Sequence, residues 1–181
     1  VYLGGTVVQG DGQGVQIVPP FDAEIAAAIE AAPPADEVPM SDDLIEAVDP
    51  REEYVACASA LASGEASARE DLHIVLTAMH GVGAAITSRV LTEAGFSNVS
   101  LVEAQAQPDP DFPTVPFPNP EEAGALDMAI EQAREQGADL IIAVDPDADR
   151  CALAVPDLAS ETGWSPLSGD QIGSLLGEFL A

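Results

Sequence analysis

Apolar residues gather in four short runs of strand length in the later part of the chain, and stretches with helical spacing separate the first three. The strands are predicted at residues 72–78, 99–102, 140–144 and 151–155, and the helices at residues 84–94 and 121–136. Strands that alternate with helices form parallel sheets, whereas a short loop makes the last two strands antiparallel neighbours. The pattern therefore predicts a three-layer α/β/α domain with a mostly parallel four-stranded sheet and one antiparallel edge strand.

Weaker patterns precede residue 72. The elements predicted there are strands at residues 1–3 and 15–18, a helix at residues 23–32, a proline-rich linker at residues 33–39, and a helical stretch from Ser41 that pauses near Asp49-Pro50 and resumes through Ala62. The buried stripe expected on that last stretch consists of Leu44, Ile45, Val48, Tyr54, Val55 and Leu61. The first 32 residues carry too little apolar surface to fold by themselves.

Charge narrows the range of partners. The chain has 32 acidic residues, five arginines and no lysine, which gives a formal net charge of -27. Such a surface repels nucleic acid and anionic membrane, so neither is expected as a partner. The chain shows no signal peptide and no membrane-spanning run, so a cytoplasmic protein is expected. Two distant cysteines, Cys57 and Cys151, form no disulfide framework, and Cys151 is expected to be a small buried side chain.

The clearest chemical signal is an acidic loop at the end of the third predicted strand, Leu140-Ile-Ile-Ala-Val-Asp145-Pro-Asp147-Ala-Asp149-Arg150. Three carboxylates this close repel one another unless a cation or hydrogen-bond donors lie between them. Carboxylate oxygens suit a hard cation, and Mg²⁺ takes a few of them together with water or phosphate oxygens. Arg150 could grip a phosphoryl group beside that cation in bidentate fashion.

Two other interpretations of this loop exist. An EF-hand needs glycine and glutamate at its sixth and twelfth positions, and counting from Asp145 those positions hold Arg150 and Pro156. That interpretation fails. A solvated hairpin turn remains open, because aspartate and proline are common turn residues.

A second corner follows the first predicted core strand, where Gly81-Val82-Gly83 leads into a helix. Backbone N–H groups of such a turn can hold an anion, but two glycines also permit close packing, and packing is the favoured interpretation. A lone histidine such as His80 is more often a hydrogen-bonded structural residue than a catalyst. The proline-rich loop at residues 105–120 is long enough to suggest a functional segment.

The acidic loop resembles the metal-binding loop of the α-D-phosphohexomutases, the phosphoglucomutase and phosphomannomutase superfamily. Three further segments are similar to signatures of the same family in the same order: Thr77-Ala-Met-His80-Gly-Val-Gly83, Phe112-Pro-Thr-Val-Pro-Phe-Pro-Asn-Pro-Glu-Glu122 and Ser168-Gly-Asp-Gln-Ile-Gly173. The resemblance implies reversible transfer of phosphate between the 1 and 6 hydroxyls of a hexose phosphate, through a phosphoserine and a hexose bisphosphate intermediate. It implies that Asp145, Asp147 and Asp149 hold Mg²⁺, that Arg150 contacts the phosphoryl group, and that His80 lies near the active site.

The same resemblance predicts a domain organisation. Residues 1–38 resemble the end of a preceding domain plus a linker, residues 39–165 the metal-binding second domain, and residues 166–181 the start of a third. The phosphoserine segment is not found in this chain, so we expect a fragment that needs the remaining domains of its parent enzyme and is inactive alone. The sugar stays open, with phosphopentomutase or sugar-bisphosphate synthase as alternatives, and a non-catalytic cation-binding module is the alternative from another class.

Overall fold

A computed structural model describes residues 2–43 and 45–181 of the chain. These residues fall into two compact units, Val1–Ala47 and Val48–Ala181. The first unit contains helix α1 (Phe21–Ala31) and two 3₁₀ turns, Gly10–Gly12 and Ala35–Glu37. Where two strands are predicted, only an antiparallel bridge between Tyr2 and Gln16 forms, and Val1 lies outside the described residues. Among the described residues of this unit, Leu3 alone is buried, in agreement with its low apolar content.

The second unit is built on a mixed five-stranded sheet of order β2-β1-β3-β4-β5. The strands are β1 (Ile74–Thr77), β2 (Val99–Leu101), β3 (Leu140–Val144), β4 (Cys151–Pro156) and β5 (Trp164–Pro166). Strand β1 pairs in parallel with β2 and β3, whereas β4 pairs antiparallel with β3. The α/β class and the four predicted strands are thereby confirmed, with boundaries that differ from the predicted ones by at most two residues.

The prediction of a mostly parallel four-stranded sheet with one antiparallel edge strand is wrong, because the sheet has five strands and two of its four pairings are antiparallel. Strand β5 pairs antiparallel with β4, so β4 is an inner strand and β5 forms the edge. Three residues that include a proline make too short a pattern to predict a strand. Tertiary packing holds β5 in place, since Trp164 is buried in the core between the sheet and helix α5 (Asp127–Gln136).

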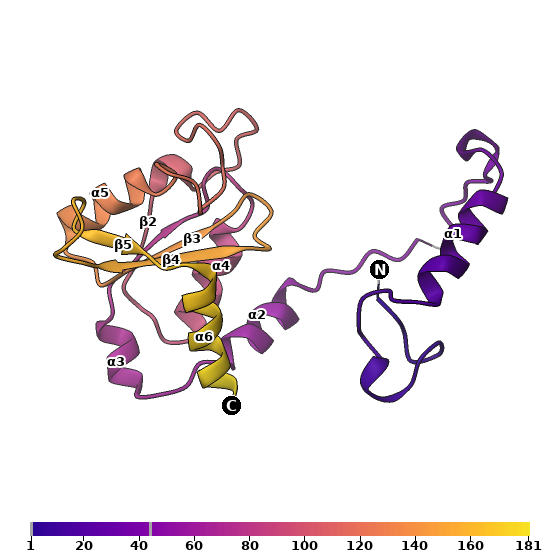
Figure 1. Ribbon diagram of the computed structural model, residues 1–181, viewed down its shortest axis with the longest axis horizontal. Helices are drawn as coiled ribbons and strands as arrows, with labels where there is room; N and C mark the ends of the chain where they lie inside the picture. The colour runs from indigo at the N-terminus through magenta and orange to yellow at the C-terminus, as the bar shows by residue number, and fades with distance from the viewer. Residues whose placement is uncertain (1, 44) are drawn as a thin grey trace. The chain divides into compact units, whose positions relative to one another are not determined.

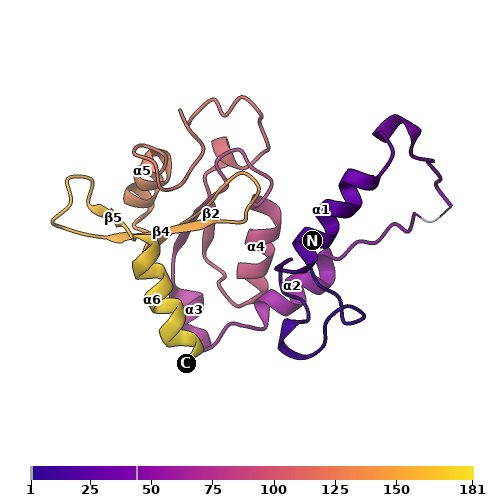
Figure 2. The same ribbon diagram turned by 45° about the vertical axis from the view of Figure 1, so that its right-hand side comes forward.

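Helices cover both faces of the sheet, which makes three layers (Figure 1). Helix α5 (Asp127–Gln136) lies on one face and α4 (Ala84–Glu93) on the other, and both views agree (Figure 1 and Figure 2). The apolar residues of α5, such as Ile130 and Ala133, pack in one core cluster with Val75 and Ile141 of the sheet. None of the described helices is both long and apolar enough to cross a bilayer.

The helices before β1 differ from the predicted ones in their boundaries and in the residues that they bury. Helix α2 covers only Arg51–Ser59, and residues 45–50 are not helical, because Pro50 disfavours helix at the residue before it. Of the predicted buried stripe only Val55 is buried; Ile45, Val48, Tyr54 and Leu61 are exposed, and Leu44 lies outside the described residues. The charged segment before β1 contains an unpredicted helix, α3 (Ala66–Asp71). Helix α6 (Gly169–Leu180) starts at a capping box of Ser168 and Gln171, as the cap residue suggests.

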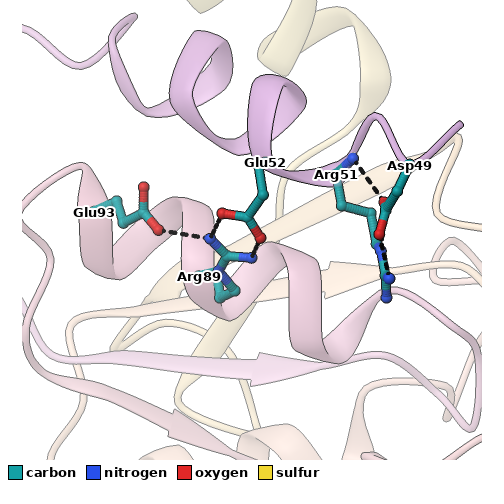
Figure 3. A network of polar contacts seen from close by, with 5 residues as sticks. All are labelled: Asp49, Arg51, Glu52, Arg89 and Glu93. Atoms are coloured by element: carbon teal, nitrogen blue, oxygen red, sulfur yellow. Dashed lines mark hydrogen bonds and ion pairs between the residues drawn. The ribbon is translucent and has the colours of Figure 1, made fainter.

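Helix α2 is joined to α4 by an ion pair (Figure 3). Arg89 donates to both carboxylate oxygens of Glu52, at 2.7 and 2.9 Å, and to Glu93 at 3.0 Å. Arg51 forms a separate local pair with Asp49. These groups are solvent-exposed, so they add little free energy individually, but the bidentate pair specifies where α2 lies on α4.

Candidate metal centre

The acidic loop is a tight turn that joins β3 to β4. The N–H of Asp145 donates to the carbonyl of Arg150 at 3.2 Å, and the N–H of Ala148 donates to the carbonyl of Asp145 at 2.9 Å. Ala148 adopts a φ of 60°, a left-handed conformation that only a few non-glycine residues take. The turn lies at the carboxyl end of β3, where open α/β sheets bind ligands.

This turn gathers the three predicted carboxylates on one side. One oxygen each of Asp145, Asp147 and Asp149 lies within 4.8 Å of the others. Asp145 is 1% exposed, whereas Asp147 and Asp149 are exposed. The cluster therefore has one carboxylate anchored in the protein and two that face solvent.

Arg150 neutralises the buried carboxylate. Its backbone N–H donates to Oδ1 of Asp145 at 3.0 Å, and its Nε and Nη2 lie 3.0 and 2.8 Å from Oδ2. Its Nη1 donates to the side-chain oxygen of Asn119 at 3.3 Å. The guanidinium thus connects the acidic turn with the proline-rich loop, while its side chain stays 56% exposed and accessible to a ligand.

The pKa values of Asp145 and Asp147 are shifted in opposite directions. Burial by itself would raise the pKa of Asp145, but hydrogen bonds from the Arg150 backbone and with Asp147, together with the Arg150 guanidinium, hold that pKa below its ordinary value. The pKa of Asp147 is raised, first by its hydrogen bond to Asp145 and then by repulsion from Asp149. One carboxylate is therefore kept ionised by the protein itself, and its neighbours supply negative charge that a cation can neutralise.

The glycine corner after β1, Gly81-Val82-Gly83, packs against the backbone of this turn. A Cβ on Gly81 would lie 2.7 Å from the carbonyl carbon of Pro146, and one on Gly83 would lie 2.9 Å from the Cβ of Ala148. The N–H of Val82 donates to the carbonyl of Pro146 at 2.9 Å. The favoured interpretation of these glycines as close packing is confirmed, and the packed partner is the acidic turn. The N–H groups of Gly81 and Val82 are both taken by carbonyls of the protein, which removes them as anion donors.

His80 lies in this corner and is buried. Its Nε2 is 2.8 Å from the hydroxyl of Thr114, and its backbone N–H donates to the carbonyl of Gln105. It is a hydrogen-bonded residue next to the acidic turn and not a member of the carboxylate cluster. The sequence reasoning missed Gln105, Thr114 and Asn119 as individual residues, although all three belong to the proline-rich loop whose length suggested function.

The expectation that Cys151 is buried is wrong, because it is exposed. Burial alternates along β4 as expected for a strand, but Ala152 and Ala154 occupy the inward positions. Sequence alternation alone does not say which phase faces the core.

The donor set of the acidic turn fits a hard divalent cation. It consists only of carboxylate oxygens, and Asp145 is oriented and kept ionised by Arg150. A solvated hairpin turn would leave its carboxylates outside the core, which the burial of Asp145 contradicts.

Comparisons with known proteins identify the family to which this chain is similar. The family model described as phosphoglucomutase/phosphomannomutase, alpha/beta/alpha domain II, matches residues 52–159. A probable phosphomannomutase of Haemophilus influenzae is 46% identical over 187 residues, which cover 100% of this chain and 36% of that protein. A phosphoglucomutase of Staphylococcus haemolyticus is 45% identical over 112 residues, covering 62% of this chain and 20% of that protein.

A solved structure has the same fold. A phosphoglucomutase/phosphomannomutase family protein from Burkholderia thailandensis superposes with a TM-score of 0.57 at 22% identity, over 75% of this chain and 26% of that one. The family model alone covers more than half of the chain, from helix α2 to the loop after β4. The chain therefore belongs to the phosphoglucomutase/phosphomannomutase family and carries its second domain.

Proposed function

We propose that this chain supplies the metal-binding domain of a phosphohexomutase, which moves a phosphoryl group reversibly between the 1 and 6 hydroxyls of a hexose phosphate. The observation that carries the proposal is the acidic turn, where Asp145, Asp147 and Asp149 converge at the carboxyl end of β3. The names of the relatives, phosphomannomutase and phosphoglucomutase, support a hexose over a pentose as the sugar.

Asp145, Asp147 and Asp149 would hold Mg²⁺ in this proposal. When bound, the cation would neutralise the charge on the transferred phosphoryl group, which is the main help that phosphoryl transfer needs. Within the chain, Arg150 keeps Asp145 ionised and oriented through Nε and Nη2. The exposed part of the Arg150 guanidinium would contact the phosphoryl group, and His80 would support the corner behind the turn and not take part in proton transfer.

A local positive charge matters because of the surface around it. With a formal net charge of -27, the chain repels a phosphorylated sugar as a whole. A bound cation and Arg150 together would reverse that field at the acidic turn. The proposal therefore places substrate attraction at the site and not in the overall charge.

The chain spans 36% of the length of the Haemophilus influenzae relative. The domains that would complete the active site are therefore also part of what we propose. We assign residues 1–38 to the end of a preceding domain and its linker, residues 39–165 to the second domain, and residues 166–181 to the start of a third. The preceding domain would carry the phosphoserine, and a hexose bisphosphate would be the intermediate that turns over in the full site.

Two measurements test the proposal. Mn²⁺, as a spectroscopic substitute for Mg²⁺, should bind the 181-residue chain at one site, and Asp147→Asn should weaken that binding. In a coupled assay, the chain should not convert glucose 1-phosphate, whereas the parent protein should convert glucose or mannose phosphates in preference to ribose phosphate. Absence of Mn²⁺ binding would contradict the metal site, and turnover by the chain alone would contradict the need for a separate phosphoserine domain.

A further inference from the structure

Behind the acidic turn, four polar side chains form a chain of hydrogen bonds that starts inside the core. The hydroxyl of Thr77 accepts from the N–H of Met79 at 3.0 Å and donates to Oε1 of Gln105 at 2.6 Å. The amide nitrogen of Gln105 donates to the hydroxyl of Thr114 at 2.8 Å. Gln105 is 1% exposed, and burying an amide is unfavourable unless its hydrogen bonds are satisfied, as they are here.

Three hydrogen bonds connect His80 with the proline-rich loop. Nε2 of His80 lies 2.8 Å from the Thr114 hydroxyl, and the N–H of His80 donates to the carbonyl of Gln105 at 2.9 Å. The carbonyl of His80 accepts from the N–H of Asp109 at 3.0 Å. Met79 and His80 have φ values of 46° and 63°, a region that non-glycine residues occupy only when their surroundings impose it.

The residues that follow His80 contact the backbone of the acidic turn. Val82 donates its N–H to the carbonyl of Pro146, and Gly81 leaves no room for a Cβ against the Pro146 backbone. Pro146 directly follows Asp145 in the chain. A shift of the corner would therefore move the residue next to the buried carboxylate, because a packed backbone contact transmits displacement.

We propose that Gln105 and Thr114 are positioning residues, which hold the acidic turn in its ligand geometry through His80, Gly81 and Val82. The inference rests on the proposed function for what the turn binds. In this inference, the proline-rich loop at residues 105–120 stabilises the acidic turn through the hydrogen bonds of Thr114 with His80 and Gln105.

Thr114 offers a matched pair of variants because its side chain is exposed, so substitution should not unfold the protein. Thr114→Val replaces the hydroxyl with a methyl group of similar size, whereas Thr114→Ser keeps the hydroxyl. In the 181-residue chain, we expect Thr114→Val to weaken Mn²⁺ binding about tenfold, the size usual for residues that orient metal ligands. Thr114→Ser should bind Mn²⁺ as tightly as the unmodified chain.

Amide hydrogen exchange of the metal-free chain tests the positioning separately. The N–H groups of Val82 and Ala148, which hold the corner and the turn, should exchange roughly tenfold faster in Thr114→Val and unchanged in Thr114→Ser. Equal exchange in all three proteins would overturn the inference. So would faster exchange in Thr114→Ser but not in Thr114→Val, which would indicate a packing role for the methyl group that serine lacks, and so would equally faster exchange in both variants, because the hydroxyl would then not account for the effect. If the unmodified chain binds no Mn²⁺, the proposed function fails, and exchange at Val82 and Ala148 still decides the positioning role.

Discussion

Strand β4 is flanked by two short loops that both contain aspartate, and these two loops differ in the contacts that their aspartates make. In the loop before it, Asp145 to Arg150, the buried carboxylate of Asp145 makes three contacts with Arg150, and the backbone of Pro146 lies against Gly81 and Val82. In the loop after it, the one hydrogen bond that the carboxylate of Asp157 accepts from the described residues comes from the N–H of Ala159, two residues on, at 2.9 Å. Asp157 is an ordinary turn residue, whereas Asp145 is part of a supported site.

The difference shows what separates a candidate ligand from a turn former. Both loops connect antiparallel strands and both are rich in residues that favour turns. In the part of the chain that the structure describes, the backbone hydrogen bonds of the second loop stay within that loop, whereas the first loop accepts one at Pro146 from Val82. Leu158, at the tip of the second loop, is fully exposed to solvent. Support by other elements, and not the aspartates alone, is the feature that distinguishes the candidate metal centre.

The largest effect should come from removing the buried charge. Asp145→Asn should weaken Mn²⁺ binding by at least about 100-fold, because a ligand is lost and the Arg150 guanidinium is left beside a neutral group. Asp157→Asn, the matched change in the other loop, should leave binding unaltered. Calorimetric titration of both variants with Mn²⁺ measures this, and equal weakening by the two substitutions would erase the distinction between the loops.

A methyl group at the corner should have the next largest effect. Gly81→Ala should lower the free energy of unfolding by about 1–3 kcal/mol, because the new Cβ meets the Pro146 backbone, and it should weaken Mn²⁺ binding as well. Gly163→Ala is the control in the second loop. At a φ of 78° with open space around it, it should cost about 1 kcal/mol through backbone strain alone.

Urea unfolding and Mn²⁺ titration together separate the two glycines. Both variants should lose stability, but only Gly81→Ala should lose metal affinity. Unchanged Mn²⁺ binding by a folded Gly81→Ala protein would mean that the corner does not position the acidic turn.

The smallest effect concerns pH. The pKa of Asp145 is lowered in the folded chain, so folding favours its ionised form. This contribution to stability is present above the unfolded pKa of aspartate, about 3.9, and is lost as the pH falls through the lower folded value. Asp145→Asn should therefore flatten the loss of stability below about pH 4 relative to Asp157→Asn, as measured by urea unfolding at stepped pH. Parallel pH profiles for the two variants would contradict the pairing of Asp145 with Arg150.

Much of the fold could be predicted because its signals are local. Strand β3 was predicted at its observed residues, since a continuous apolar run ends sharply at Asp145. Helix α5 ends at its predicted last residue, Gln136, and Gly137 after it adopts a left-handed φ of 65°. The helix starts at Asp127, six residues after the predicted start at residue 121, because turns with Gly124 at a φ of 84° occupy that segment. Strand β5 depends on the burial of Trp164, which a three-residue pattern does not reveal.

By itself, the sequence determined the α/β class, the parallel strands and the position of the acidic turn at the end of β3, because these follow from periodicity and from residues that are neighbours in the chain. Only the tertiary structure decided that Asp145 is buried, that Arg150 reaches Asn119, and that Gln105 and Thr114 support His80 behind the turn. The contacts of Arg150 with Asn119 and of His80 with Thr114 join residues 31 and 34 positions apart, and the burial of Asp145 places one side chain of a polar cluster inside the core. Local preference carries no information about such pairings, since they form only when the sheet brings distant loops to the same edge.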